Sequence, residues 1–484
     1  MPKFLAKYFS IPSLFRIIFL FLFFTSIKSQ AQDTDNHYII IDTITFEGNN
    51  KTKNFVIERE LLFKKGTVYE SADLDEMAKN SKNLLINTNL FVTAEVKWTE
   101  VRRKHVTVSV IVSEKWYIWP IPFFELADRN YKQWADKEYA LNRTNYGLYL
   151  FMYNFRGRNE TLKLSFINGY TRNYGIQYTV PFLDKTGKYG LDVSASYKQN
   201  KEIWYLTRND SLQFYKNFEK TLIQRSENRI AFLTRRNNFA TERWEIEYNF
   251  IKISDTIDTK SLNPDFLLSG TKQNEIFLKH IFIYEKRDNK YYPLKGFYFK
   301  NEVALGTIKG DTVSIEMIKE AAEAGIYREI YKKVYLSAFV KARLANEPLP
   351  FIPYNNFKAF GYKDFVRGYE QYVVDGHAFM LAKLNLKFAL IHQYMLKTPV
   401  KLNKKNFRLP LGVYLNMYSD WGKVYNNQWQ DNKTIYNNTL IKKDLVGYGA
   451  GLDMLFLNDK IFRFEYSLNI LGDKNFNLHF EKTF

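Results

Sequence analysis

The sequence predicts a secretory signal, a small α+β domain and a transmembrane antiparallel β-barrel of about 16 strands. Three observations support this order. Residues 1–31 carry basic charge, then an apolar run, then small residues. Residues 37–115 have the mixed pattern of a compact domain. From residue 117 to the end of the 484 residues, short segments alternate apolar and polar side chains, as membrane strands do.

The signal is predicted from Lys3, Lys7 and Arg16, which precede the apolar run 17–24, with small residues at 29–31 as a cleavage point. The apolar run is too short for a comfortable membrane span, although an uncleaved anchor is the alternative. The chain contains no cysteine. This excludes disulfides, thiolate metal sites and a cysteine-linked lipid anchor.

Residues 37–115 predict the order β-α-α-β-β. Thr52 is placed to cap the first helix and Ser71 to open the second, because hydroxyl oxygens accept hydrogen bonds from free N–H groups at helix starts. The closing hairpin turns at three basic residues, 102–104. The expected elements are strand 38–46, helices 52–63 and 71–85, and strands 91–98 and 106–112.

The barrel is predicted over residues 117–484. Two prolines among aromatic side chains, Pro120 and Pro122, mark a junction and the first barrel strand. The clearest later strand is 462–470, where alternate side chains would face lipid and the lumen. Residues 314–323 fit a short helix as well as a strand, which leaves the strand count open by about two.

The formal net charge is +19, and four of these charges lie in residues 1–31, which leaves +15. The remaining charge is scattered without a dense basic block, so no nucleic-acid partner is predicted. A basic lumen, a face turned to lipopolysaccharide and a compositional bias of the source genome are all compatible with it. The sequence has no nucleophile, zinc or phosphate-loop motif, and its six histidines are widely separated. We therefore predict no catalytic residue, no metal and no cofactor.

A long segment from Ala345 to Gly376 carries three prolines and predicts an ordered loop between two amphipathic strands. It contains Val366-Arg367-Gly368-Tyr369. An arginine followed by glycine and an aromatic residue is, by itself, an ordinary turn composition.

Three short segments of the N-terminal module carry a resemblance to a known family. They are Phe46–Asn49, Asn89–Phe91 and Val112–Lys115. Together with the β-α-α-β-β order, they resemble a POTRA domain. Domains of that family bind extended polypeptide at an exposed sheet edge, so the resemblance implies an unfolded protein client.

A signal, one POTRA-like module and a barrel in this order make the whole mature chain similar to the Omp85 superfamily, typified by the BamA and TamA families. Val366-Arg367-Gly368-Tyr369 matches the superfamily hallmark on the loop between the eleventh and twelfth strands. Our strand count also places this loop there. Further matching segments are 154–157, 284–296, 419–422 and the terminal Phe484 that follows Phe476, Leu478 and Phe480.

The resemblance implies that this loop folds into the lumen and that Arg367 meets acidic side chains of the wall. A buried arginine needs such partners. Asp420 is the first candidate, from the family pattern, and Glu465 is the second, because alternation turns it inward. Gly368 would permit a tight turn and Tyr369 would pack the tip. The implied role is to brace the barrel, with no chemistry.

The resemblance also implies lateral opening at a seam between the first and last strands. Pro120 and Pro122 each lack a donor and would weaken pairing there, although a simple linker role is the alternative. The expected seam residues are Pro120, Pro122, Phe476, Leu478, Phe480 and Phe484.

Such a protein would lie in the outer membrane of a Gram-negative cell, with its POTRA domain in the periplasm, and would insert unfolded outer-membrane clients at the seam. Outer-membrane lipids and accessory lipoproteins are further expected partners. A single POTRA module departs from the several found in BamA-type and TamA-type members. Two alternatives therefore remain: a dedicated translocator of secreted clients, as in two-partner secretion, and a passive channel.

Overall fold

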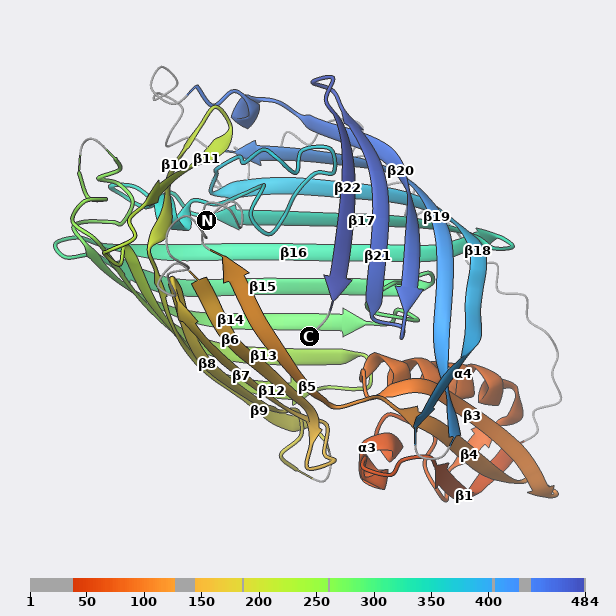
Figure 1. Cartoon of the computed structure of the whole chain (residues 1–484). Coiled ribbons are helices and arrows are strands. Elements are labelled where there is room, and N and C mark those ends of the chain that lie inside the picture. The colour runs from red at the N-terminus through yellow and green to blue at the C-terminus, as the bar shows by residue number, and fades with distance from the viewer. Residues whose placement is uncertain are drawn as a thin grey trace, which may run out of the picture.

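The computed structural model describes residues 38–126, 144–184, 187–259, 262–402, 405–425 and 437–482. The predicted signal, residues 1–31, and Phe484 lie outside these ranges. The strands form a four-stranded sheet, a 16-stranded sheet and a separate two-stranded hairpin (Figure 1). Within the described ranges, no helix combines the length and apolar character needed to cross a membrane.

The N-terminal domain is a sheet of order β2-β1-β4-β3 with two helices. β1 and β4 are parallel, and the other pairs are antiparallel. Side chains from both helices and three strands build one buried apolar core, including Ile41, Leu74 and Phe91. The elements are β1 (Tyr38–Glu47), α3 (Asn54–Glu58), β2 (Val68–Glu70), a 3-10 turn (Ser71–Asp73), α4 (Leu74–Asn87), β3 (Phe91–Arg102) and β4 (His105–Glu114).

The first helix is shorter than the sequence predicts, and its N-cap is Lys53 instead of Thr52. The Thr52 hydroxyl is already used, because it donates to Glu114 and accepts from Asn154 Nδ2 at 2.7 Å. The hydroxyl group therefore does not cap the helix. It joins the domain to the barrel at Asn154. The turn after β1 depends on Gly48, whose φ is +89° and whose added Cβ would lie 1.9 Å from the Val112 carbonyl oxygen.

The 16-stranded sheet follows chain order, except that β9 pairs directly with β12 because β10 and β11 form the separate hairpin. All neighbouring strands are antiparallel. The predicted barrel of about 16 strands is confirmed. Its strands are β5 (Ile118–Leu126), β6 (Thr144–Phe155), β7 (Glu160–Gly169), β8 (Thr171–Val180), β9 (Tyr189–Asn200), β12 (Ile223–Arg235), β13 (Ala240–Ile253), β14 (Lys272–Glu285), β15 (Gly296–Lys309), β16 (Ser314–Tyr331), β17 (Val334–Ala345), β18 (Ala378–Leu402), β19 (Lys405–Tyr425), β20 (Leu445–Phe456), β21 (Lys460–Asn469) and β22 (Lys474–Lys482), and the hairpin is β10 (Glu202–Arg208) with β11 (Ser211–Lys216).

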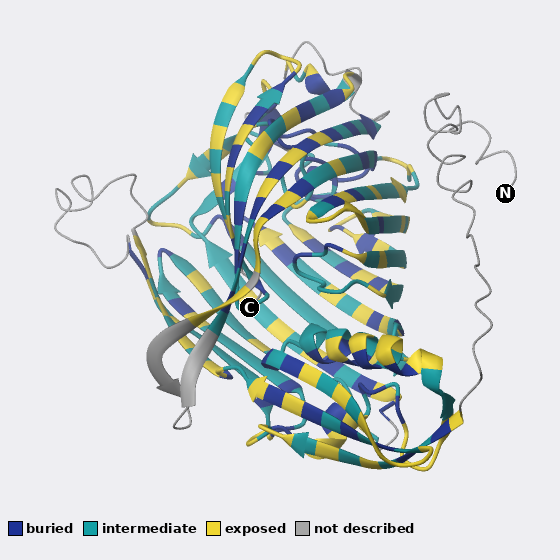
Figure 2. Ribbon diagram, turned by 90° about the vertical axis from the view of Figure 1, so that its right-hand side faces the viewer, coloured by how far each residue is buried: buried dark blue, intermediate teal, exposed yellow. Residues whose placement is uncertain are grey.

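Residues 314–323 belong to β16, so the helical alternative is wrong. β16 bonds to β15 on one side and to β17 on the other. The barrel strands show the alternation expected of a membrane sheet, visible as bands of exposed and buried residues in Figure 2. On β21, for example, Phe464 and Tyr466 are exposed, whereas Glu465 and Ser467 are buried.

The N-terminal domain lies against one end of the barrel, and the β10–β11 hairpin lies at the other end (Figure 1). β5 and β22 are the two terminal strands of the 16-stranded sheet. Among the described residues, no hydrogen-bond ladder joins these two strands.

Candidate functional site

The loop between β17 and β18, residues 346–377, folds against the inner face of the sheet. Phe360 forms bridges to Asp364 and Val374, so the loop carries its own backbone structure. Val366 and Tyr369 are buried in an apolar cluster built from the loop and from strands β18, β19 and β20. The loop is therefore packed as part of the barrel interior.

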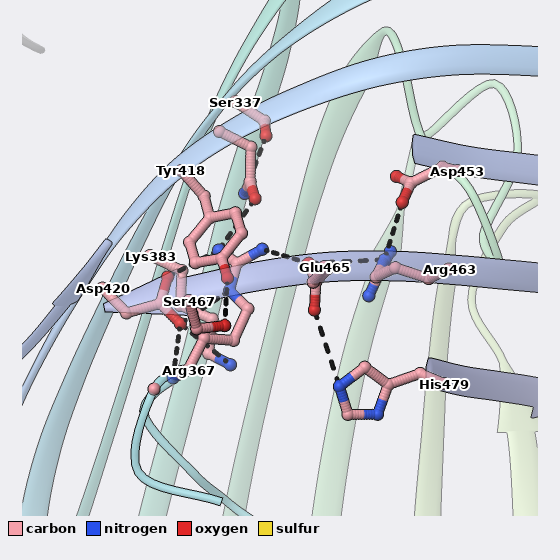
Figure 3. A network of polar contacts seen from close by, with 12 residues as sticks. Ser337, Arg367, Lys383, Tyr418, Asp420, Asp453, Arg463, Glu465, Ser467 and His479 are labelled. Carbon is pink, nitrogen blue, oxygen red and sulfur yellow. Dashed lines mark hydrogen bonds and ion pairs between the residues drawn. The ribbon is translucent and has the colours of Figure 1, made fainter. Parts of the chain in front are cut away.

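Arg367 lies at the centre of this site, and only 5% of it is exposed. Its Nε donates to Asp420 Oδ2 at 2.9 Å and its Nη2 to Asp420 Oδ1 at 2.6 Å, which is a bidentate pair (Figure 3). Nη2 also donates to Asn385 Oδ1 at 2.8 Å, and Nη1 lies 3.4 Å from Glu465 Oε1. The guanidinium carbon lies 3.7 Å from the centroid of the Tyr418 ring. One side chain thus links β18, β19 and β21.

Further charged pairs continue from this arginine along the wall (Figure 3). Glu465 Oε1 lies 3.7 Å from Arg463 Nε, which donates to Asp453 Oδ1 at 2.9 Å. Asp453 Oδ2 accepts from the Tyr292 hydroxyl at 2.8 Å. Tyr292 belongs to the turn between β14 and β15, at the end of the barrel that faces the N-terminal domain. A continuous series of polar contacts therefore runs from the loop to that turn.

Two glycines allow the loop to lie this close to the strands. Gly368 has φ of +89°, and its carbonyl oxygen accepts from Asn469 Nδ2 at 2.7 Å. On β20, a Cβ added to Gly447 would lie 1.7 Å from the Arg367 carbonyl oxygen. Any side chain at residue 447 would therefore push the loop away. Gly447 is not among the predicted site residues, although the glycines at alternate positions 447, 449 and 451 indicate a close approach on one face of the strand.

The structure brings Arg367 together with both acidic residues named as its partners, Asp420 and Glu465. Sequence reasoning did not find Asn385, Tyr418 or Arg463, because strand alternation indicates an inward side chain but not which strands it faces. Within the described ranges, no group of three or more His, Cys, Asp or Glu is placed to hold a metal ion.

Five of the six expected seam residues lie on the terminal strands, and Phe484 lies outside the described residues. Pro120 and Pro122 are inside β5, where they face Leu150 and Leu148 of β6. On β22, the exposed fractions of Phe476, Leu478 and Phe480 are 71%, 62% and 50%. These three side chains point away from the barrel interior, as lipid-facing residues do.

The N-terminal domain is fixed to the barrel by hydrogen bonds to several turns. Asn87, at the end of α4, donates to the Arg287 carbonyl oxygen at 3.0 Å and accepts from the Lys290 N–H at 3.0 Å. Glu60 accepts from both terminal nitrogens of Arg235 at 2.8 and 2.6 Å. Each contact joins the domain to a different barrel turn, so the domain has a defined orientation.

Lys115 lies in the middle of this junction. Its Nζ is 3.3 Å from Asp459 Oδ2 on the turn between β20 and β21. Burial lowers the pKa of Lys115 to about 8, and the nearby Asp459 carboxylate only partly opposes this shift. Asp459 also pairs with Lys460, at 2.8 Å.

Comparisons with known proteins agree with this architecture. The family model described as "Omp85 superfamily domain" matches residues 154–470, and the POTRA model, described as "Surface antigen variable number repeat", matches residues 39–115. None of the curated proteins compared with the chain matches it.

Among solved structures, CdiB from Escherichia coli has 12% identity and a TM-score of 0.51, over 91% of this chain and 75% of that chain. BamA from Haemophilus ducreyi lacking POTRA domains 1-3 has 14% identity and a TM-score of 0.49, over 92% and 83%. At 12% identity the likeness to CdiB concerns the fold alone. Because the Omp85 model covers more than half of its residues, the chain is a member of the Omp85 superfamily, a non-enzymatic assembly or transport protein of the Gram-negative outer membrane with its POTRA domain in the periplasm.

Proposed function

We propose that this protein inserts client β-barrel proteins into the outer membrane. In this proposal, residues 37–115 receive an unfolded client along the outer edge of β3, beyond Val92, whose carbonyl oxygen accepts from Asn458 Nδ2 at 2.8 Å. The barrel, residues 117–484, accepts the client's strands at the seam between β5 and β22. The observation that carries the proposal is that these terminal strands share no ladder among the described residues. An unpaired strand edge templates another strand.

The cost of unsatisfied backbone groups in lipid explains how such a seam would work. A client strand that pairs with the seam satisfies its own N–H and C=O groups and those of the seam at the same time. No ladder between β5 and β22 has to be broken among the described residues, so client strands enter the membrane at little net free-energy cost.

The Arg367 site would keep the barrel in shape while the seam is open. Arg367 bonds to Asn385 on β18, Asp420 on β19 and Glu465 on β21. These strands lead up to β22, so the brace acts on the side of the barrel next to the seam. A route through the lumen would require this buried loop to leave, which favours insertion over secretion.

Conditional depletion tests the function. We expect a broad loss of heat-modifiable barrel proteins from the outer membrane after depletion. Loss of one or a few exported proteins would instead indicate a dedicated secretion route, and an unchanged outer membrane would contradict both.

A reducible cross-link tests the seam. Because the chain has no cysteine, Phe124→Cys with Phe476→Cys can be joined by a reducible bismaleimide. We expect joining to block insertion and reduction to restore it. The matched control joins Phe464→Cys to Leu478→Cys, which face each other on the paired strands β21 and β22 and should leave insertion unchanged. Equal activity of the joined seam and the control would contradict insertion at this site.

A further inference from the structure

We infer that the hairpin formed by β18 and β19 binds anionic phospholipid headgroups in the periplasmic leaflet of the outer membrane. This surface is not used in the proposed insertion of clients, so the inference does not depend on that function. The ligand is the surface of a bilayer that contains an anionic phospholipid.

The β18–β19 hairpin extends beyond the neighbouring strands at the end of the barrel that carries the POTRA domain (Figure 1). The ladder between β17 and β18 ends at Phe388, and the ladder between β19 and β20 begins only at Leu411. β18 and β19 continue to pair with each other as far as Leu402 and Lys405. Residues 390–409 therefore form a two-stranded ribbon outside the wall of the barrel.

One face of β19 carries an unbroken row of apolar side chains. Alternate residues of a strand lie on the same face, and this row consists of Leu409, Leu411, Val413, Leu415 and Met417. On the wall of the barrel, Leu415 and Met417 are 47% and 56% exposed, as lipid-facing side chains are. The row therefore continues the lipid-facing surface of the barrel onto the ribbon.

Two register shifts in β18 place its apolar side chains on the same face as this row. The shifts lie between Ala389 and Ile391 and between Ile391 and Tyr394. As a result, Ile391, Tyr394 and Leu396 are each paired with a member of the β19 row, and paired residues of a ladder share a face. These three residues are 40%, 57% and 41% exposed in the full chain, so the POTRA domain does not cover them.

The ribbon is also basic. Residues 390–411 contain five Lys or Arg and no Asp or Glu, which is a denser positive charge than elsewhere in the chain. An apolar face combined with Lys and Arg binds the headgroup region of an anionic membrane. The basic residues are Lys397, Lys401, Lys404, Lys405 and Arg408.

The backbone of the ribbon indicates how deep it can lie. Among the described residues, no third strand pairs with residues 390–402. Unpaired backbone groups are costly in hydrocarbon but can bond to water in the hydrated headgroup layer. The ribbon therefore fits the membrane surface and not the membrane core. A second copy of the chain is a poorer partner, because two basic ribbons repel each other.

The accessibility of a dye in proteoliposomes tests this assignment. The full chain, which has no cysteine of its own, carries Tyr394→Cys labelled with a bimane maleimide. It is reconstituted in phosphatidylcholine, with or without phosphatidylglycerol. The quencher is acrylamide, which is neutral and therefore does not respond to the lipid charge. We expect phosphatidylglycerol to reduce quenching of this label by about threefold.

Two other labelled positions give the limits of the measurement. Phe166→Cys lies on the exposed outer face of β7, where lipid should protect the dye, and Val101→Cys lies on the exposed tip of β3 in the POTRA domain. We expect quenching at both positions to be independent of phosphatidylglycerol.

Charge substitutions test the role of the basic residues. Neutralising three of them should abolish the effect of phosphatidylglycerol on the Tyr394→Cys label, once a heat-modifiable barrel has been verified. The substitutions are Lys401→Gln, Lys405→Gln and Arg408→Gln. If this variant does not fold, about 1 M NaCl should abolish the effect in the chain with unchanged charges, because the Debye length falls to about 3 Å.

The matched control removes the same charge from exposed residues of the POTRA domain and should keep the full effect of phosphatidylglycerol. Its substitutions are Lys97→Gln, Arg102→Gln and Arg103→Gln.

Four results would overturn the inference. The Tyr394→Cys label could be as accessible as Val101→Cys in both lipids, or equally protected in both, which would mean that anionic headgroups are not recognised. Protection in isolated outer-membrane vesicles but not in proteoliposomes would assign the ribbon to a protein partner. Protection in detergent that increases with protein concentration would assign it to a second copy. None of these results bears on client insertion, which the depletion experiment tests separately.

Discussion

At the residue scale, the barrel interior contains the buried Arg367, and a neutral residue in its place would leave the Asp420 carboxylate without its arginine partner. Arg367 and Asp420 are both buried and form a bidentate pair. A buried ion pair adds little net stability over apolar packing, but removing one partner leaves the other as an uncompensated buried charge. The pair therefore acts mainly to fix the position of the loop.

Arg367→Ala should lower barrel stability by about 3–5 kcal/mol. Asp420 would lose both guanidinium hydrogen bonds and keep only the backbone N–H of residue 367, at 3.2 Å, and Lys383, whose Nζ lies 3.5 Å from Oδ2. Arg367→Lys should lower the stability by an intermediate amount, because lysine keeps the positive charge but cannot form the bidentate pair of a guanidinium with a carboxylate. The measurement is the temperature at which the folded band disappears in a heat-modifiability gel.

The double variant Arg367→Ala/Asp420→Asn is the control for this prediction. It replaces the Asp420 carboxylate, which Arg367→Ala leaves without its arginine partner, by a neutral amide, so part of the lost stability should return. If both variants melt like the unchanged chain, the proposed bracing role of Arg367 is wrong.

Some residues of the site could be predicted from the sequence and others could not. Arg367 stood in a recognisable motif, and Glu465 was inward by alternation. The alternating glycines at 447, 449 and 451 indicate a close approach on one face of the strand, but not which segment approaches Gly447, because the Arg367 carbonyl oxygen that a Cβ would meet at 1.7 Å belongs to a distant loop. Asn385 and Tyr418 had no local signal for the same reason.

At the element scale, strand periodicity predicted most of the barrel, but two elements needed the tertiary structure. Residues 314–323 contain three glutamates, two alanines, one methionine and one lysine, all of which favour helices. Ladders on both sides of β16 override that preference. Thr52 has the chemistry of a helix cap, but a carboxylate and an amide from other elements use its hydroxyl group.

The junction between the POTRA domain and the barrel should strengthen as the pH rises from about 8 to about 10.5. The Lys115 pKa falls to about 8 in the folded protein, so the folded state loses this proton before the unfolded state does. Stability rises with pH wherever the unfolded state binds more protons. The measurement is the thermal unfolding midpoint at pH 7.5 and at pH 9.5.

Lys115→Met isolates this effect. It should be more stable than the unchanged chain at pH 7.5 and should lose the rise between the two pH values, while Asp459 keeps its pair with Lys460. Lys97→Met changes an exposed lysine of the same domain and should leave the pH dependence unchanged. A normal pH dependence in Lys115→Met would contradict the role given to the junction.

At the scale of the whole molecule, other parts of the chain contact the barrel at both ends, and a loop packs inside it. The POTRA domain bonds to periplasmic turns through Asn87 and Glu60. At the other end, Asp210 of the β10–β11 hairpin accepts from the backbone N–H groups of Thr439 and Leu440 at 3.0 and 3.1 Å. The Arg367 loop packs between these two ends. An open pore is therefore not the state that the structure describes.

This arrangement predicts low and irregular ion conductance for the purified chain in a planar bilayer. Replacing Pro348–Gly376 by a short Gly/Ser linker removes the packed loop from the inner face and should give a larger, steadier current. Arg367→Lys, which keeps the loop and a positive charge, should resemble the unchanged chain, because the apolar cluster around Val366 and Tyr369 still holds the loop in place. A large, steady current from the unchanged chain would mean that the loop does not close the lumen. The passive-channel function would then account for the barrel better than insertion at the seam.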